Sequence, residues 1–261
     1  MRAYLRGVGI FAAGLNGWNA AEAVLKGEKP YEFAESSLPS PEILPPAERR
    51  RAASTVRCAL AVAHEAISMS GIAPDSVASV FASSGGDGNT LQQICEALAL
   101  PERAVSPTRF HNSVHNAAAG YWSIATRSHT ASASVCAYDA SFAAGLLDAM
   151  SLVATEKNHV LLVAYDCPYP QPLRALRSIR ESFAAAFVLS AKPGAVPLAC
   201  WEVSLKEGAA PSLQDVPETL SANPAARALP LLVALAKNKE CSIELEYLEG
   251  QHVWVECKPG S

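Results

Sequence analysis

The sequence predicts an α/β protein with a mixed, largely parallel β-sheet that helices cover on both faces. The chain has 261 residues, half of them apolar, which is enough to bury a sizeable core. Short apolar runs typical of buried strands alternate with alanine-rich runs whose apolar residues recur at helical spacing. Such alternation is typical of parallel sheets with two covered faces.

The first hundred residues supply two predicted strands, three helices and a proline-rich loop. Gly27 and Gly71 mark the ends of two helices, and Pro46 marks a start. The glycine-rich turn at 83–88 fits neither phosphate-binding pattern, GxxxxGK[ST] or GxGxxG, so we expect it to pack against another loop. In order, we expect a strand at 4–11, a helix at 19–26, a loop at 28–46, a helix at 46–71, a strand at 77–82 and a helix at 89–98.

The central stretch, residues 105–150, carries the most informative pattern. It reads as a loop, a small-residue helix at 112–126, a strand at 132–138 and a second small-residue helix at 140–154. Because the turn before the second helix has no spare residues, its tip is presented at a helix N-terminus. The N–H groups and the macrodipole there favour an anion.

Asp139 occupies this tip. We interpret it as the N-cap of the helix, accepting a hydrogen bond from the N–H of Ser141 or Phe142. A nucleophilic aspartate is the alternative. An acyl-aspartyl anhydride would be labile, however, and poorly suited to carrying an acyl group between partners.

The last hundred residues end in a predicted hairpin. Glu249 and Gly250 form its two-residue turn, in which glycine suits the positive φ that the turn requires. Ahead of it we expect strands at 159–165, 183–190 and 198–205 and a helix at 224–237, and the hairpin strands lie at 242–248 and 251–257.

Composition argues against several classes of function. The formal net charge is -4, and the basic residues are scattered apart from a run at 49–51, so no basic stripe indicates nucleic acid. The seven cysteines form no CxxC pair, which favours reduced thiols in the cytoplasm, without disulfides or metal. No run reaches the roughly eighteen apolar residues of a membrane span, and we expect no cofactor.

Several motifs resemble one known family. They are RGVGIFAAGLNGWNAAEAVLKG at the start, VFASSGGDG, SPTRFHNSVHNAAAG, SASVCAYDAS and ESFAAAFVLS. To about Ser190 the chain is similar to the N-terminal half of β-ketoacyl synthases, the condensing enzymes of the thiolase superfamily. The resemblance implies a thiolase-like layered fold, truncated relative to a full ketosynthase. Residues 1–191 would form the N-terminal half, and residues 192–261 a shortened strand-helix-hairpin remnant packed on it.

The departures from this family bear on activity. Counting without gaps from Gly120 places Asp139 where the family has its acyl-accepting cysteine, and Cys136 would lie inside the preceding strand. Motifs resembling EAHGTGT and GHxxGAAG, which hold the family's catalytic histidines, are absent. The only histidines beyond residue 130 are His159 and His252, which we interpret as structural groups.

The resemblance therefore points to a chain-length-factor-like, catalytically silent ketosynthase partner, of the short form associated with aryl-polyene clusters. It implies a heterodimer with a full-length ketosynthase, which supplies the chemistry, and contact with acyl carrier protein through that complex. The chain would then be a subunit of a 3-oxoacyl-[acyl-carrier-protein] synthase complex without catalytic residues of its own. We expect no membrane partner and no nucleic acid.

The resemblance also implies two sets of site residues. The strand before Asp139 would pair across the dimer axis, since a lone subunit would leave this edge open. Its interface residues would be Ser132, Ser134, Cys136, Asn116 and Trp122. The loop before the small-residue helix would project over the partner's acyl tunnel, with Phe110, His111, Val114 and His115 as gate or floor. Ordinary loop and core packing is the alternative for these four.

Two other functions compete with this hypothesis. One is a divergent acyltransferase or malonyl decarboxylase that uses Asp139 with His111 or His115 and acts on carrier-protein thioesters. The other is a self-sufficient homodimeric acyl-binding module.

Overall fold

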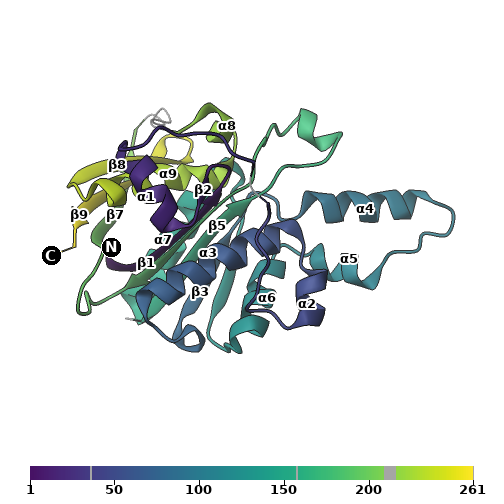
Figure 1. Ribbon diagram of the computed structural model, residues 1–261, viewed down its shortest axis with the longest axis horizontal. Helices are drawn as coiled ribbons and strands as arrows, with labels where there is room; N and C mark the ends of the chain where they lie inside the picture. Colours follow the sequence, from purple (N-terminus) through teal and green to yellow (C-terminus); the bar gives the residue numbers. More distant parts are fainter. Residues whose placement is uncertain (36, 157, 209–215, 261) are drawn as a thin grey trace.

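A computed structural model describes residues 1–35, 37–156, 158–208 and 216–260. In these residues nine strands form one sheet, ordered β4-β3-β5-β6-β1-β7-β9-β8 with the short β2 paired to β1 (Figure 1). The strands are β1 (Arg2–Ala12), β2 (Leu15–Asn16), β3 (Ala78–Ala82), β4 (Ser132–Val135), β5 (His159–Asp166), β6 (Phe183–Ser190), β7 (Ala199–Glu207), β8 (Cys241–Leu248) and β9 (Gln251–Pro259).

The described helices differ in length and in depth of burial. The long ones, α3 and α7, lie on the sheet, whereas α4 and α5 stand out from the body (Figure 1). The α-helices are α1 (Trp18–Lys26), α2 (Pro46–Arg51), α3 (Ser54–Ser70), α4 (Gly88–Ala99), α5 (Pro107–Asn112), α6 (Ala117–Thr126), α7 (Ser141–Glu156), α8 (Glu218–Ser221) and α9 (Leu229–Lys237), and the 3-10 turns are η1 (Pro74–Ser76), η2 (Tyr138–Ala140), η3 (Leu173–Ala175) and η4 (Pro224–Ala228).

The sheet is mixed, as predicted, but the expectation that it is largely parallel is wrong. Among the described strand pairs only β3–β4 and β3–β5 are parallel, and six pairs are antiparallel. Helices α4, α5 and α6 connect β3 to β4, and α7 connects β4 to β5; a parallel pair requires such a crossover. No long helix separates β5 from β6 or β8 from β9, so these strands return as antiparallel neighbours.

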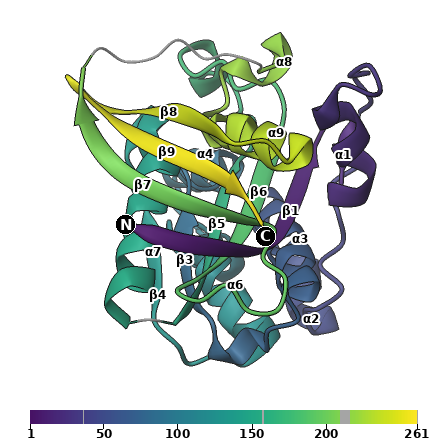
Figure 2. The same ribbon diagram turned by 90° about the vertical axis from the view of Figure 1, so that its left-hand side faces the viewer.

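The two faces of the sheet have separate cores. Successive side chains of β5 alternate between them: Leu161 and Val163 join the core under α3 and α6, whereas Leu162 and Ala164 join the core under α7 and α9. Figure 2 shows α7 and α3 on opposite sides of the sheet. The near-continuous apolar runs of β5 and β6 follow from this double burial.

Two glycines let α3 lie directly against β1. A Cβ on Gly7 would stand 2.0 Å from the carbonyl oxygen of Ala66, and one on Gly9 would stand 2.3 Å from that of Val62. Neither position has room for a side chain. The glycines of the motif RGVGIF are therefore packing residues.

The segment beyond residue 191 extends the same sheet. β7 pairs with β1, β9 pairs with β7, and β8 closes this end as the hairpin partner of β9 (Figure 2). Asn223 ties the segment to the rest: its Nδ2 donates to the backbone oxygens of Asp166 and Glu181, at 3.1 and 2.9 Å. The C-terminal part is thus continuous with the N-terminal sheet.

Candidate functional site

The carboxyl ends of β3, β4 and β5 meet at one edge of the sheet because these three strands are parallel. The strand predicted at 132–138 is shorter: β4 ends at Val135, and Cys136 and Ala137 lead into η2. The helix predicted at 112–126 is likewise shorter: α6 begins at Ala117, and Asn112 is the last residue of the separate helix α5. The expected strand-to-helix corner therefore exists, but it holds more residues than its spacing suggested.

Tyr138 stands at the apex of this corner. Its φ is +53°, a left-handed conformation that is rare for a bulky side chain, and 61% of the residue is exposed. Ser141 braces the turn, because its Oγ accepts from the Ala137 N–H at 3.0 Å and donates to the Tyr138 oxygen at 2.7 Å. Backbone strain of this kind persists only where surrounding bonds hold it, and it is common at functional sites.

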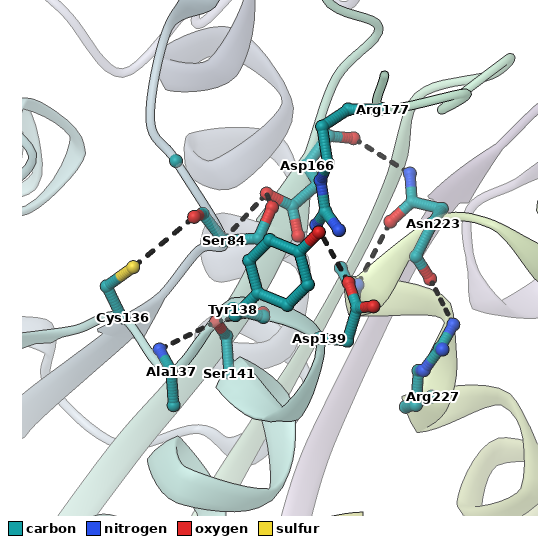
Figure 3. Close-up of polar contacts among 12 residues, drawn as sticks. Ser84, Cys136, Ala137, Tyr138, Asp139, Ser141, Asp166, Arg177, Asn223 and Arg227 are labelled. Atoms are coloured by element: carbon teal, nitrogen blue, oxygen red, sulfur yellow. Dashed lines mark hydrogen bonds and ion pairs between the residues drawn. The ribbon is translucent and has the colours of Figure 1, made fainter.

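Asp139 does not cap α7, so that interpretation is wrong. It lies within η2, and its Oδ1 accepts a hydrogen bond from Arg177 Nη2 at 2.7 Å (Figure 3). The Arg177 guanidinium also lies over the Tyr138 ring, 3.8 Å from its centroid. The carboxylate is thus neutralised by an arginine from the loop after β5, a partner too distant in sequence for local spacing to reveal.

Asp166, which the sequence analysis overlooked, organises the end of β5. The residue is fully buried, and its Oδ1 accepts three hydrogen bonds, from Ser83 Oγ, Ser84 N and Ser84 Oγ, at 2.9 to 3.0 Å. Oδ2 has no partner among the described residues. Burial raises the pKa of this carboxyl to about 6, although the serine bonds act in the opposite direction. The polar residue at the end of an apolar strand was the only sequence signal for it.

Cys136 lies past the end of β4, which corrects its placement inside the strand. It is exposed, and its Sγ donates to the Ser84 oxygen at 3.3 Å (Figure 3). The thiol therefore lies at the same sheet edge as Asp166 and the η2 turn.

The four gate candidates lie on α5 and the turn after it, but they have different contacts. Phe110 and Val114 are exposed, at 66% and 48%. His111 packs edge-on against Tyr121, with ring centroids 5.5 Å apart. His115 Nε2 lies 2.9 Å from the Ser83 oxygen. In the described part of the chain neither histidine contacts Asp139.

The edge of the sheet next to β3 is formed by β4. Since Ala131 and Val135 accept bonds from β3, the intervening Ser132 and Ser134 turn their backbone N–H and C=O groups outward. Asn116 is exposed nearby at the start of α6. Of the two roles considered for Trp122, core and interface, its burial favours the core: the residue is 1% exposed and belongs to the core under α6.

The structure also bears on metal and membrane sites. Within the described ranges, no group of three or more histidines, cysteines and carboxylates is placed to hold a metal ion. No helix there has the length and apolarity to cross a membrane.

The sheet has a core on each face, with α7 on one side and α3 on the other, and β4 leads through η2 into α7. This arrangement is a thiolase-like fold. The sequence matches the family described as Beta-ketoacyl synthase, N-terminal domain, over residues 19–255. This chain belongs to that family. No curated protein sequence matches it significantly.

Solved structures share the fold along the whole chain. The ketosynthase ApeO in complex with its chain length factor ApeC, from Xenorhabdus doucetiae, matches with a TM-score of 0.74 at 20% identity. The ishigamide ketosynthase/chain length factor matches with 0.77 at 12%, and the AntDE:AntF complex of a type II polyketide ketosynthase with its acyl-carrier protein with 0.79 at 11%. Each match covers 99% of this chain and 99% of the other.

Proposed function

We propose that this chain is a catalytically silent, chain-length-factor-like subunit. It forms a heterodimer with a full-length β-ketoacyl-[acyl-carrier-protein] synthase and shapes the acyl tunnel of that enzyme. One observation carries the proposal: the corner where the family presents its nucleophile holds Tyr138 at its apex and Asp139 in an ion pair with Arg177. A guanidinium-bound carboxylate is a poor nucleophile, and its acylation would give a labile anhydride in place of a thioester.

Condensation needs more than this corner provides. A thiolate must hold the growing chain, and imidazoles must support decarboxylation of the malonyl unit and stabilise the enolate. His111 and His115, the two histidines considered as catalytic partners of Asp139, instead contact Tyr121 and the Ser83 carbonyl. The chain must therefore obtain reactivity from a partner.

The outward groups of β4 support pairing with that partner. Ser132 and Ser134 offer unpaired backbone donors and acceptors, and their small side chains allow close approach. Two of the similar structures are a ketosynthase in complex with its chain length factor and a ketosynthase/chain length factor. We propose the same seam here, with Asn116 at its margin.

The exposed end of α5 supports the gate. Phe110 and Val114 present apolar side chains that are exposed in the described part of the chain, so they can reach a partner's tunnel, and the two histidines would form its rim. A tunnel wall limits product length by volume. We place this role in the cytoplasm, in the synthesis of aryl polyenes or similar fatty-acid-like chains, consistent with seven free thiols.

The first test measures condensation with malonyl and acyl carrier protein. The purified chain alone should give no product, the ketosynthase alone little, and the mixed complex full turnover. Turnover by the chain alone would contradict the proposal.

The second test compares product lengths for Val114→Phe and Val114→Ala in the complex. The larger side chain should shorten the products and the smaller one should lengthen them. Val196→Phe is the matched control, because Val196 is exposed in the loop between β6 and β7. Unchanged lengths in both Val114 variants would refute the gate.

The exposed thiol of Cys136 favours a second candidate, a divergent acyltransferase that acts on carrier-protein thioesters. Its signature would be a covalent acyl adduct on the chain alone, lost in Cys136→Ala. Under the main proposal the wild-type chain alone forms no such adduct.

A further inference from the structure

Two cysteines stand directly opposite each other in the C-terminal hairpin. Cys241 opens β8, and its partner in the antiparallel register with β9 is Cys257. Directly opposite residues of such a pair have Cα atoms about 4.5 or 5.5 Å apart and side chains on the same face. Disulfides form where Cα atoms are roughly 4.4 to 6.8 Å apart. The hairpin backbone therefore already has the spacing that a disulfide between these residues requires.

The two thiols differ in exposure. Cys257 is 4% exposed and belongs to the core that includes α9, whereas Cys241 is partly exposed. Burial, and after it the neighbouring Cys241, raises the pKa of the Cys257 thiol, which therefore stays protonated at about pH 7. A reagent from solvent thus reaches Cys241 first, and Cys257 stands behind it in position to react with the product.

A second pair of thiols lacks this access. Cys167 Sγ lies 3.8 Å from Cys58 Sγ, but Cys58 is fully buried and Cys167 is 8% exposed. Buried cysteines in apolar surroundings are inert, because the reactive thiolate is not formed there. The hairpin pair differs in combining a facing partner with a thiol that solvent can reach.

We propose that Cys241 and Cys257 are a reversible redox pair that reacts with hydrogen peroxide. The Cys241 thiolate attacks the peroxide, the O–O bond breaks, and Cys241 becomes a sulfenic acid as one water leaves. The Cys257 thiolate then attacks the Cys241 sulfur, the S–S bond forms, and the sulfenic oxygen leaves as a second water. Two thiols lose two electrons and two protons, which reduce one peroxide to two waters. Exchange with a small thiol restores both cysteines.

The disulfide would staple the edge of the sheet. It closes a loop that contains the rest of β8, the hairpin turn and most of β9, and closing such a loop restricts the unfolded chain. β8 also lies against η2, the turn that carries Tyr138, so the stiffened hairpin borders the candidate site. The inference does not rest on the proposed function, because it concerns the chain alone.

The test exposes the reduced, folded full-length chain to a slight excess of hydrogen peroxide and maps disulfides by peptide mass spectrometry. A Cys241–Cys257 disulfide should form with the loss of two hydrogens. Its rate should rise about tenfold per pH unit above neutrality, because each step needs a thiolate. The oxidised chain should melt about 8 °C higher than the reduced chain.

Variants separate the two roles. Cys257→Ser removes the second thiol, so dimedone should trap sulfenic acid at Cys241 with about ten times the wild-type yield. Cys241→Ser should leave Cys257 reduced. The matched control, Cys95→Ser, changes an exposed cysteine on α4 and should form the hairpin disulfide at the wild-type rate.

Three results would overturn the proposal. The first is a folded wild-type chain that forms no Cys241–Cys257 disulfide. The second is a Cys58–Cys167 disulfide that forms equally fast, which would mean that access does not decide the reaction. The third is equal trapping of Cys241 in the wild type and in Cys257→Ser, which would mean that Cys257 does not react with the sulfenic acid.

Discussion

The two edge strands of the sheet, β8 and β4, differ in charge and in regularity. β8 carries Glu244 and Glu246 on its exposed side and has a register shift beside Leu248. β4 has the sequence Ser-Ala-Ser-Val, without charge and without a shift in its pairing with β3. Charges and bulges are devices that keep a free edge from pairing with another chain.

The difference indicates which edge is meant to pair. At β8 the sequence prevents addition of a strand, and at β4 it permits one. The helices α4 and α5, the second of which carries the exposed Phe110, lie between β3 and β4 in the chain and stand out from the body (Figure 1). Assembly is therefore expected on this side only.

Ser134→Pro gives the largest expected effect. Proline removes an outward N–H of β4 that makes no bond to β3, so the fold should be retained while edge pairing is lost. The affinity for the ketosynthase should fall by about 3 kcal/mol, roughly 100-fold, in a calorimetric titration. Ser134→Ala is the control and should bind normally. Wild-type affinity in the proline variant would contradict pairing through β4.

Asp166→Asn should change how the folding stability of the chain depends on pH. Because burial raises the pKa of Asp166 to about 6, the folded chain binds this proton more tightly than the unfolded chain. The wild type therefore loses up to about 3 kcal/mol of unfolding free energy, relative to the variant, as the pH rises from about 4 to about 6. Denaturant unfolding across this range checks it, and parallel curves for the two proteins would rule the effect out.

Phe110→Ala should weaken ketosynthase binding by about 1.5 kcal/mol, roughly tenfold, since an exposed aromatic anchor is lost. The melting temperature of the chain alone should not change. Leu248→Ala removes a comparably exposed apolar residue at the β8 end and should have no effect on affinity. Equal losses in the two variants would mean that the partner covers both ends.

Glu244→Val/Glu246→Val should have the smallest effect. Removing charge from β8 opens that edge and should produce weak, concentration-dependent self-association, on the order of 1 kcal/mol or less, in sedimentation velocity. Ketosynthase binding should be unaffected. If the double variant stays monomeric at every concentration, charge is not what protects this edge.

Much of the fold could be predicted from local pattern. The apolar runs of β5 and β6 and the turn at Glu249 and Gly250 marked real elements, because double burial and a tight hairpin leave strong local signals. Strand direction was mispredicted, since it depends on how β6 and β7 return beside β1, which no local pattern records.

The candidate site was predicted less well. The motif placed Asp139 and Cys136 at the right corner, yet their contacts depend on Arg177 and Ser84, which are 38 and 52 residues away. The strain at Tyr138 was also invisible, because positive φ at a bulky residue comes from the surrounding structure and not from its own preference. A tryptophan is common both in cores and at interfaces, so the sequence left the role of Trp122 open, and its burial in the structure favours the core.

Hydrogen exchange at the two edge strands, measured with and without a full-length ketosynthase, tests the central claim most directly. The account predicts that the outward amides of Ser132 and Ser134 become protected on complex formation while those of β8 exchange as before. A complex that forms with β4 still exchanging freely, or with protection at β8 instead, would contradict it.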